Sequence, residues 1–354
     1  MSDLSALVNV PDFADAAAGR LEAGLLGYYA GGAGDERTLA ENEAAFARRR
    51  LRPRVLVDVS TVSAATTVLG TDVSMPVLVG PTALHGMAHP DGEPGMARAA
   101  AAAGTVYCLS TLATSRPSEV AAEAPAAPRW FQVYCFRDKA VTRALVDEAV
   151  EHGFGALVLT VDAPRAGRRE RDLRTGFNVP AEVDMPAVRA ATGAPTCPTP
   201  AEFFSLLDLT LDWSVVAELA EHGLPVVIKG IQTAEDAALA AEHGAAAVVV
   251  SNHGGRQLDG VAASIDVLPE AVEAVAGGAE VYMDGGVRRG TDVLVALALG
   301  ARAVLVGRPA LWGLAVAGEA GVLRVLDLLR AEVELGLTLL GAPTPAEVTR
   351  AHVS

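Results

Sequence analysis

Short aliphatic runs alternate with helical patterns through the C-terminal three quarters of the chain. The same order recurs in residues 148–162 (EAVEHGFGALVLTVD), 218–230 (ELAEHGLPVVIKG) and 239–252 (LAAEHGAAAVVVSN). In each, Glu-His-Gly predicts the end of a helix, because glycine adopts the left-handed conformation found there and histidine complements the helix dipole. The continuous aliphatic run that follows predicts a strand buried on both faces, as in a parallel sheet covered by helices.

Eight such runs predict eight parallel strands, and this number indicates an α/β fold of the (β/α)8, or TIM barrel, type. The predicted strands are residues 76–81, 106–111, 129–135, 156–162, 225–230, 246–252, 280–286 and 303–308. Barrel enzymes place their chemistry at the C-terminal ends of the strands. Polar side chains gather at those ends here, whereas the strand starts carry mostly Pro, Ala and Val. The polar residues are Ser110, Gln132, Tyr134, Thr160, Asp162, Lys229, Ser251, Asp284 and Arg308.

The segment before the barrel, residues 1–75, predicts an N-terminal helical region. One helix is expected from Asp12, as its cap, to the glycine cluster at 31–34. Thr38 followed by Glu41 fits a capping box for a second helix at 39–49.

Two further features complete the predicted architecture of one domain, residues 1–354, with the barrel at 76–354. Apolar stretches at 52–60 and 66–75 predict a hairpin that closes the floor of the barrel. The long interruption at 163–212 follows the fourth strand, which places it over the active face. A loop of this length is typical of a lid or of a disordered segment.

The charge and the cysteines narrow the class of protein. The chain of 354 residues has 28 Lys and Arg against 43 Asp and Glu, a formal net charge of −15. Such a balance repels phosphate backbones and argues against a nucleic-acid partner or a basic membrane-binding patch. Three cysteines without a C-x-x-C pair indicate a reducing compartment. No signal peptide or membrane span is visible, so a soluble cytoplasmic protein is expected.

The histidines differ in their predicted positions. Three belong to helix-ending turns at the opposite end of the barrel: His152, His222 and His243. His85 and His89 lie in the first loop of the active face, where structural and pocket-lining roles are equally open. His253 directly follows a buried strand, and glycines behind it allow the backbone to approach a ligand. Asp162, at the end of the fourth strand, needs a partner, which is either such a histidine or an arginine of the following loop.

Basic residues and glycines suggest an anionic, phosphate-bearing ligand. The loop arginines at 165–174 form a basic run, and an arginine fork suits a carboxylate. Glycine turns after the seventh and eighth strands, each followed by a helix N-terminus, predict the common barrel phosphate site. Lys229 ends the fifth strand, where a lysine is costly unless it lies beside an anionic cofactor. No metal-binding motif is present, so no metal is predicted.

The chain resembles the FMN-dependent L-2-hydroxy-acid oxidase and dehydrogenase family. The resemblance spans nearly the whole chain and is carried by PTALHGMAHPDGE, LTVDAPRAGRRERDLR, SNHGGRQLDG and DGGVRRGTDVLVALALGA. It implies His253 as the catalytic base, paired with Asp162. It further implies carboxylate binding by Arg256, Arg169 and Tyr28, and a hydrogen bond from Tyr134 to the substrate hydroxyl oxygen.

The resemblance also implies FMN as the cofactor, with Lys229 stabilising the anionic reduced ring. The flavin contacts it implies are Pro81, Thr82, Ala83, Ser110, Gln132, Thr160 and Ser251. The ribityl and phosphate contacts are Asp284, Gly285, Gly286, Arg288, Gly307 and Arg308. The expected partners are a small anionic 2-hydroxy acid and O₂, and the expected assembly is a homotetramer or octamer.

Two departures from the glycolate oxidase pattern concern the substrate side chain. Leu112 replaces a tryptophan, and Ala166 replaces a larger aliphatic residue. Both changes enlarge the pocket and favour a bulky substrate such as mandelate or 4-hydroxymandelate. Ala83 beside the flavin favours an oxidase that forms H₂O₂. The alternatives are a dehydrogenase that uses a quinone or carrier acceptor, or an activity like that of lactate monooxygenase.

Overall fold

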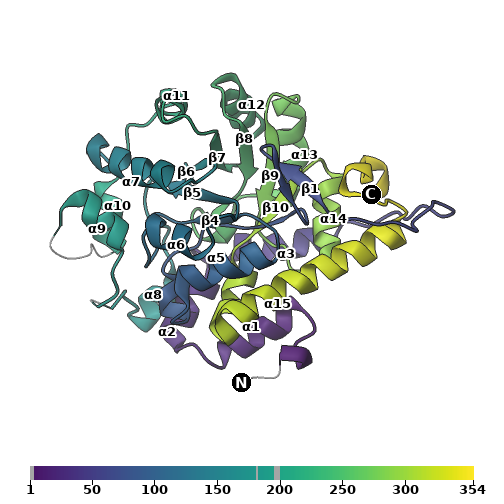
Figure 1. The fold of residues 1–354 in the computed structure, drawn as a ribbon, viewed down its shortest axis with the longest axis horizontal. Helices are drawn as coiled ribbons and strands as arrows, with labels where there is room; N and C mark the ends of the chain where they lie inside the picture. Colours follow the sequence, from purple (N-terminus) through teal and green to yellow (C-terminus); the bar gives the residue numbers. More distant parts are fainter. Residues whose placement is uncertain (1–3, 181, 195–199) are drawn as a thin grey trace.

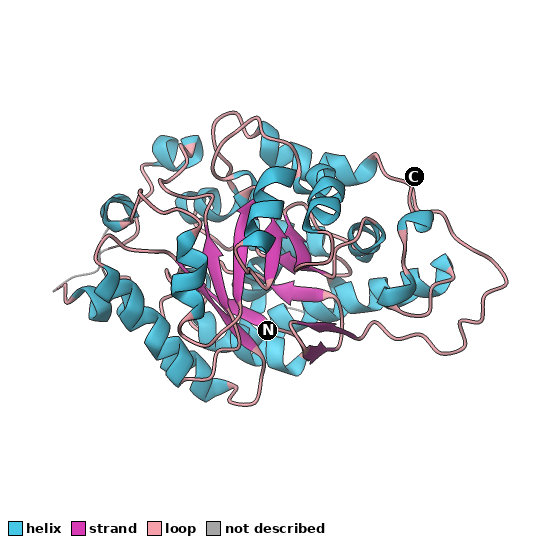
Figure 2. Ribbon diagram, turned by 90° about the horizontal axis from the view of Figure 1, so that it is seen from above, coloured by secondary structure: helices cyan, strands magenta, loops and turns pink. Residues whose placement is uncertain are grey.

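Eight parallel strands close into a barrel in the computed structural model, which describes residues 4–180, 182–194 and 200–354. The strands follow one another around the barrel in chain order, and β10 pairs with β3 to close it (Figures 1 and 2). They are β3 Val77–Val79, β4 Tyr107–Leu109, β5 Arg129–Val133, β6 Leu157–Thr160, β7 Val226–Ile231, β8 Ala247–Val250, β9 Glu280–Asp284 and β10 Ala303–Val306. The prediction of eight strands in a TIM barrel is confirmed.

Helices surround the barrel and cover the outer faces of its strands (Figure 1). Gly153, Gly223 and Gly244 have φ values of 70°, 81° and 84°, so the three repeated turns end helices in the left-handed conformation, as predicted. The helices of this layer are α4 His85–Ala88, α5 Gly92–Ala102, α6 Pro117–Glu123, α7 Lys139–Glu151, α11 Ser214–Ala220, α12 Ala234–Glu242, α13 Ser264–Val275, α14 Gly290–Ala298 and α15 Arg308–Leu340. Short 3-10 turns are η1 Leu4–Ala6, η2 His253–Gly255, η3 Pro345–Glu347 and η4 Arg350–His352.

The core has two layers because strand residues alternate between the faces of the sheet. Val227 and Val249 belong to the inner cluster with Trp130 and Tyr282, whose rings lie 5.6 Å apart. The neighbouring Ile228 belongs to the outer cluster, between strands and helices. Both faces are buried, which explains why the strands appear in the sequence as unbroken aliphatic runs.

A hairpin closes the N-terminal end of the barrel, but it is shorter than predicted. Strands β1 Thr66–Val68 and β2 Thr71–Val73 pair antiparallel, joined by Leu69 and Gly70 in the left-handed conformation of a tight turn. The Leu69 N–H donates to Glu280 Oε2 at the start of β9, 3.2 Å away. Both strands come from the second apolar stretch alone.

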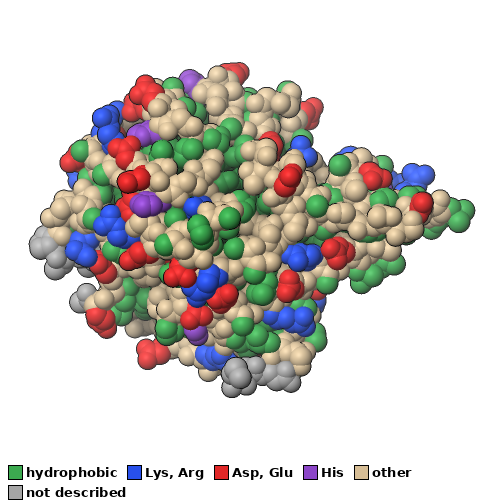
Figure 3. All heavy atoms as spheres, in the orientation of Figure 1, with side chains coloured by type: hydrophobic (Ala, Val, Ile, Leu, Met, Phe, Trp, Pro, Cys, Tyr) green, Lys and Arg blue, Asp and Glu red, His purple; other side chains and the backbone are tan. Residues whose placement is uncertain are grey.

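The prediction of a strand at 52–60 is therefore wrong. This segment projects from the body beside the end of α15, where the Arg54 N–H donates to the Leu340 carbonyl (Figure 1). Apolar side chains lie at the tip of this projection (Figure 3). The relative exposures of Val55 and Leu56 are 82% and 104%. Apolar sequence without a partner strand does not form a sheet.

The predicted single N-terminal helix is two helices, α1 Val10–Ala18 and α2 Ala23–Ala30. The first is capped by Asn9, whose side chain accepts the Asp12 N–H at 2.9 Å, and not by Asp12 itself. Gly19 ends it, in keeping with the low helix propensity of glycine.

The predicted capping box at Thr38 is also wrong. Helix α3 is Arg37–Ala47, so Thr38 lies inside it. The Thr38 N–H donates to Asp259 Oδ1 at 2.8 Å, and its hydroxyl accepts the Gly260 N–H. A partner more than 200 residues away in the chain replaces the local cap and ties α3 to the loop after β8.

The segment at 163–212 lies over the C-terminal end of the barrel, where several of its side chains line the cavity described below. It contains α8 Glu170–Thr175, α9 Pro186–Thr192 and α10 Pro200–Leu206. A bridge between Leu207 and Phe136 ties its end to the chain after β5. Among the described residues, none of the helices has both the length and the apolar character to cross a membrane.

Candidate active site

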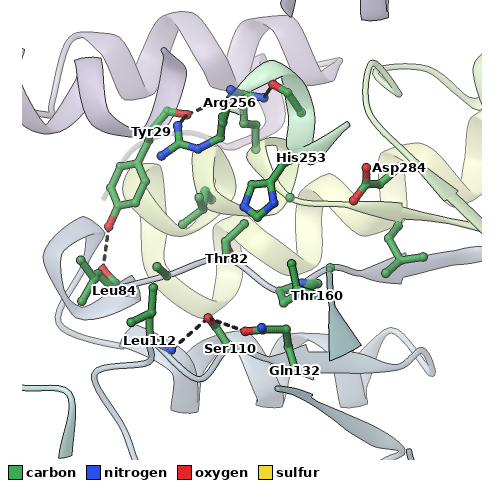
Figure 4. Close-up of a pocket in the computed structure, with 18 of the residues that line it drawn as sticks. Tyr29, Thr82, Leu84, Ser110, Leu112, Gln132, Thr160, His253, Arg256 and Asp284 are labelled. Carbon is green, nitrogen blue, oxygen red and sulfur yellow. Dashed lines mark hydrogen bonds between the residues drawn. The ribbon is translucent and has the colours of Figure 1, made fainter. Parts of the chain in front are cut away.

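A cavity of about 1410 Å³, counting its open mouth, lies at the C-terminal ends of the barrel strands. Figure 4 shows polar side chains from several strands converging on it. Two residues singled out from the sequence, Asp162 and Ser251, lie buried behind the lining. The others line the cavity: Tyr28, Pro81, Thr82, Ala83, Ser110, Leu112, Gln132, Tyr134, Thr160, Ala166, Arg169, Lys229, His253, Arg256, Asp284, Gly285, Gly286, Arg288, Gly307 and Arg308.

His253 points into the cavity from the turn after β8 (Figure 4). The ring nitrogen Nδ1 lies 2.8 Å from Asp162 Oδ1, and the backbone N–H of His253 donates to Ser251 Oγ at 3.1 Å. Its φ of 58° is left-handed, a strained value for a side chain other than glycine. Gly230 makes room for the carboxylate, since a Cβ there would lie 2.7 Å from that of Asp162. The structure thus brings together the histidine–carboxylate pair that the sequence predicted.

The Asp162 carboxylate is held in its charged form. Burial alone would raise the pKa of Asp162, but the His253 ring and Lys229 together bring that pKa below its usual value. Asp162 Oδ1 therefore accepts from His253 Nδ1, which leaves Nε2 as the ring nitrogen that exchanges a proton.

This depressed pKa predicts a pH-dependent loss of stability. Because the folded pKa is below the unfolded one, the carboxylate stabilises the fold above pH ~4 and this contribution disappears as the pH falls toward the folded pKa. We expect Asp162→Asn to lower the free energy of unfolding by about 1–3 kcal/mol at pH 7. Urea titrations of both proteins from pH 7 to pH 3 check this. If the difference in free energy of unfolding between the wild type and Asp162→Asn stays constant down to pH 3, the prediction is contradicted.

Two arginines and a tyrosine form a cationic wall at one side of the cavity. The guanidinium carbons of Arg256 and Arg169 each lie 5.1 Å from the centre of the Tyr28 ring. Burial, with a further contribution from Arg169, lowers the pKa of Arg256 to about 10, so Arg256 stays charged at neutral pH. Arg169 pairs with Asp172 at 3.2 Å, whereas the described residues give Arg256 no ion pair, so the positive charge of Arg256 favours an anionic ligand in the cavity.

Lys229 lies fully inside the barrel mouth and is paired. Its Nζ lies 2.8 Å from both Ser251 Oγ and Asp284 Oδ2. Burial lowers the pKa of Lys229, but Asp284 and Asp162 raise it by more, so the lysine remains a cation. Ser251 is therefore placed as a support for Lys229 and His253, one layer behind the cavity wall.

The side-chain amide of Gln132 has its oxygen engaged and its nitrogen available. Its Oε1 accepts the Thr111 N–H at 3.1 Å and the Ser110 hydroxyl at 3.3 Å. Its Nε2 is buried and has no hydrogen-bond partner among the described residues, and the same is true of Asp284 Oδ1. Buried polar atoms are costly without partners, so a donor and an acceptor await a polar ligand.

The glycine turns after β9 and β10 form the basic end of the cavity. At Gly286, a Cβ would lie 1.9 Å from the Asn42 carbonyl oxygen, so only glycine allows this approach. Arg288 pairs with Glu43 at 2.8 Å. Arg308 donates to the carbonyls of Tyr29, Gly31 and Gly254, which leaves one hydrogen on each of its terminal nitrogens for a ligand.

Helix α15 begins at this basic end with Gly307 at its N-cap position, and none of the described side chains caps this helix end with a hydrogen bond. The N-terminus of α14 differs, because Asp292 accepts the N–H groups of Arg288 and Arg289. Of the two predicted phosphate-binding helix ends, α15 is therefore the one that suits an anion.

The residues present fit FMN. The basic end, with Arg308 and α15, suits the phosphate, and the unpartnered Gln132 Nε2 suits a ring carbonyl. The buried cation of Lys229 suits a ring that becomes negatively charged on reduction. Among the described residues, no cluster of three or more metal-ligating side chains is found.

Several lining residues were missed from the sequence. Three of them are direct chain neighbours of predicted site residues, and this was the signal that the sequence offered: Tyr29, Gly254 and Gln257. Four apolar residues come from the segment over the barrel: Val179, Met185, Phe203 and Phe204. Phe203 and Phe204 are adjacent in the chain and belong to the segment that was predicted to cover the active face, which was the signal that the sequence offered for them. His89 does not line the cavity.

The fold and the site together define a flavin-dependent barrel oxidoreductase. The model of the FMN-dependent dehydrogenase family matches residues 17–354, and the chain belongs to this family, with FMN as its cofactor. It is 47% identical to glycolate oxidase 3 of Oryza sativa subsp. indica over 353 residues, which cover 98% of this chain and 96% of the relative. It is also 47% identical to an L-lactate oxidase of Nostoc sp. over 351 residues, 96% of each chain.

Solved structures agree with the family. The crystal structure of a mandelate oxidase with (S)-4-hydroxymandelic acid has a TM-score of 0.92, 40% identity and 98% coverage of both chains. A structure of a Pediococcus acidilactici lactate oxidase has a TM-score of 0.91 at 37% identity, covering 96% of this chain and 92% of that one.

Proposed function

We propose that this enzyme oxidises an L-2-hydroxy acid with a bulky, aryl-type side chain to the 2-oxo acid and passes the electrons to O₂, forming H₂O₂. The observation that carries the proposal is the convergence of a base and a carboxylate-binding wall on one cavity. His253 is backed by Asp162 at 2.8 Å, and Arg256 and Arg169 both lie over Tyr28. Relatives named glycolate, lactate and mandelate oxidases support the 2-hydroxy acid as the substrate class.

Each residue has a role in this reaction. Arg256 and Arg169 bind the substrate carboxylate, which fixes the α-carbon in the cavity. Burial raises the pKa of Tyr134, which keeps its proton and donates it in a hydrogen bond to the substrate oxygen. His253 accepts a proton, from either the α-carbon or the hydroxyl, and Asp162 stabilises the resulting charge. FMN supplies the acceptor for the two electrons.

Apolar walls support a bulky side chain. Leu112 and Ala166 line the cavity where the glycolate oxidase pattern has larger residues. The Tyr134 ring lies 5.6 Å from Phe203 and 6.3 Å from Phe204, both edge-on, an arrangement that aromatic rings favour. Identity is higher to the glycolate oxidase above than to the mandelate oxidase, so the lining of the cavity carries this part of the proposal.

A larger side chain at position 112 should fill the space for the substrate side chain and shift the preference from mandelate toward glycolate. We expect Leu112→Trp to lower kcat/KM for mandelate at least about tenfold, because the lost space costs more than 1.4 kcal/mol in the transition state, while glycolate turnover stays within about twofold. Leu258→Trp is the control, because Leu258 is 72% exposed and does not line the cavity. Equal losses for both substrates in Leu112→Trp argue against the side-chain assignment.

An aerobic substrate panel tests the proposed reaction as a whole. Glycolate, lactate, mandelate, 4-hydroxymandelate and longer hydroxy acids are incubated with the holoenzyme, and peroxide and oxo acid are both measured. We expect equal amounts of the two products and the highest kcat/KM for the aryl substrates. Oxo acid that forms only with a quinone or dye acceptor identifies a dehydrogenase. A carboxylic acid shortened by one carbon, with CO₂ in place of peroxide, identifies a monooxygenase.

We also infer a homotetramer or octamer in the cytoplasm. The projecting segment ends in Val55 and Leu56, which are exposed at 82% and 104%, and exposed apolar tips of this kind favour protein–protein contact. Light scattering after gel filtration tests the assembly. A monomer at micromolar concentration refutes it.

A further inference from the structure

His85 lies beside the cavity without lining it and is fully buried. Its ring bridges two hydroxyl groups. Nε2 lies 2.5 Å from Thr82 Oγ1, and Nδ1 lies 3.3 Å from the Tyr107 hydroxyl. Tyr107 belongs to β4 and packs in the outer layer, whereas Thr82 lines the cavity. The imidazole therefore connects the outer layer of the barrel to the cofactor cavity.

The neutral ring carries one N–H, and its neighbours decide which nitrogen holds it. Burial lowers the pKa of His85 by more than Glu93 raises it, so the ring is neutral at physiological pH. Burial also raises the pKa of Tyr107, which keeps its hydroxyl hydrogen. The Glu93 carboxylate does not contact the ring: it accepts from the backbone N–H groups of His85 and Thr114 and from the hydroxyl groups of Thr114 and Ser115.

His85 Nδ1 is the acceptor that the described residues offer to the buried Tyr107 hydroxyl. If Nδ1 accepts this hydrogen, then Nε2 carries the ring hydrogen and donates it to Thr82 Oγ1. The opposite tautomer leaves the Tyr107 hydrogen buried without a partner, at a cost of about 1–3 kcal/mol. The first tautomer is therefore favoured, and in it the Thr82 hydroxyl hydrogen is free to point into the cavity.

We propose that Tyr107, His85 and Thr82 form a hydrogen-bond relay that presents the Thr82 hydroxyl to FMN as a donor. Thr82 lines the cavity and is one of the flavin contacts that the family resemblance implies, and a hydrogen-bond donor to the ring binds its reduced, negatively charged form more tightly than its oxidised form. The relay thus raises the midpoint potential of the bound flavin. His85 acts as a positioning residue in it, since it touches neither substrate nor cofactor.

The test compares the potential and the FMN affinity of the wild-type holoenzyme with those of Thr82→Val and His85→Leu. In both variants the affinity for reduced FMN, relative to oxidised FMN, should fall about fivefold, since one hydrogen bond is lost. Spectroelectrochemistry measures this ratio through the midpoint potential. Retention of the wild-type potential in His85→Gln is expected, because the glutamine amide can also donate to Thr82.

A double mutant separates the relay from a purely structural role. If His85 acts through Thr82, the double variant has the potential of Thr82→Val alone. Additive shifts overturn the relay, as does a lower Tm in His85→Leu with an unchanged potential. If His85→Leu does not fold, the pair Thr82→Val and His85→Gln carries the test. The potential should fall in Thr82→Val and stay at the wild-type value in His85→Gln, and an unchanged potential in Thr82→Val overturns the proposal.

Discussion

Replacing His253 with glutamine is expected to lower turnover about 10²- to 10⁴-fold, the usual contribution of a positioned general base. The reason is geometric: the imidazole points into the cavity and Asp162 fixes it through Nδ1, 2.8 Å away. Glutamine can donate to Asp162 but cannot accept a proton at neutral pH. Anaerobic mixing with substrate, with flavin reduction followed by absorbance, measures the step directly.

The control for this variant is His222→Gln, because His222 lies in a helix-ending turn and pairs with Asp147, away from the cavity. Its rate of flavin reduction should be that of the wild type. His253→Gln should also retain bound FMN, since His253 is one of many residues that line the cavity. Near-normal flavin reduction in His253→Gln would refute the assignment of this residue as the base.

Replacing Arg256 with methionine is expected to lower kcat/KM about 10²- to 10³-fold, mainly through a higher KM. Truncating one partner of a buried, hydrogen-bonded charge pair costs roughly 2–5 kcal/mol, and 1.4 kcal/mol is tenfold. Arg256 is partly buried and its guanidinium lies over Tyr28, in the cationic wall of the cavity. Steady-state kinetics and substrate titration of the oxidised enzyme measure the two effects.

Arg168→Met is the matched control, because Arg168 is exposed, lies beside Arg169 in the chain and does not line the cavity. Its kinetic constants should stay within about twofold of the wild type, since an exposed charge is screened by solvent. The FMN affinity of Arg256→Met should also be close to that of the wild type. An unchanged affinity for the hydroxy acid in Arg256→Met counts against the carboxylate assignment.

Sequence reasoning succeeded where the signal was local. The barrel strands are buried on both faces, so each one is an aliphatic run that can be recognised without knowledge of its partners. The polar residues that end these runs all meet at one end, because parallel strands share a direction. His253 directly follows one of the predicted strands, so the strand pattern and the shared strand direction together identified it as a candidate site residue.

The predictions failed where distant contacts decide the local structure. Thr38 fitted a capping box, but Asp259 and Gly260 engage it across the fold. The apolar residues at 52–60 suggested a strand, but in the described part of the chain they belong to neither of the two sheets. In both places a short-range propensity, worth roughly 1 kcal/mol, was outweighed by the tertiary surroundings.

The sequence alone therefore determined the barrel, the face that carries the chemistry, and the flavin family to which its motifs point. Only the tertiary structure decided that Phe203 and Phe204 line the cavity, and that Ser251 supports Lys229 from behind it. Only the tertiary structure also placed His85 between Tyr107 and Thr82. The physical reason is that strand and turn signals depend on near neighbours in the chain. The hydrogen-bond partner of a buried polar group depends instead on which elements the closed barrel brings together.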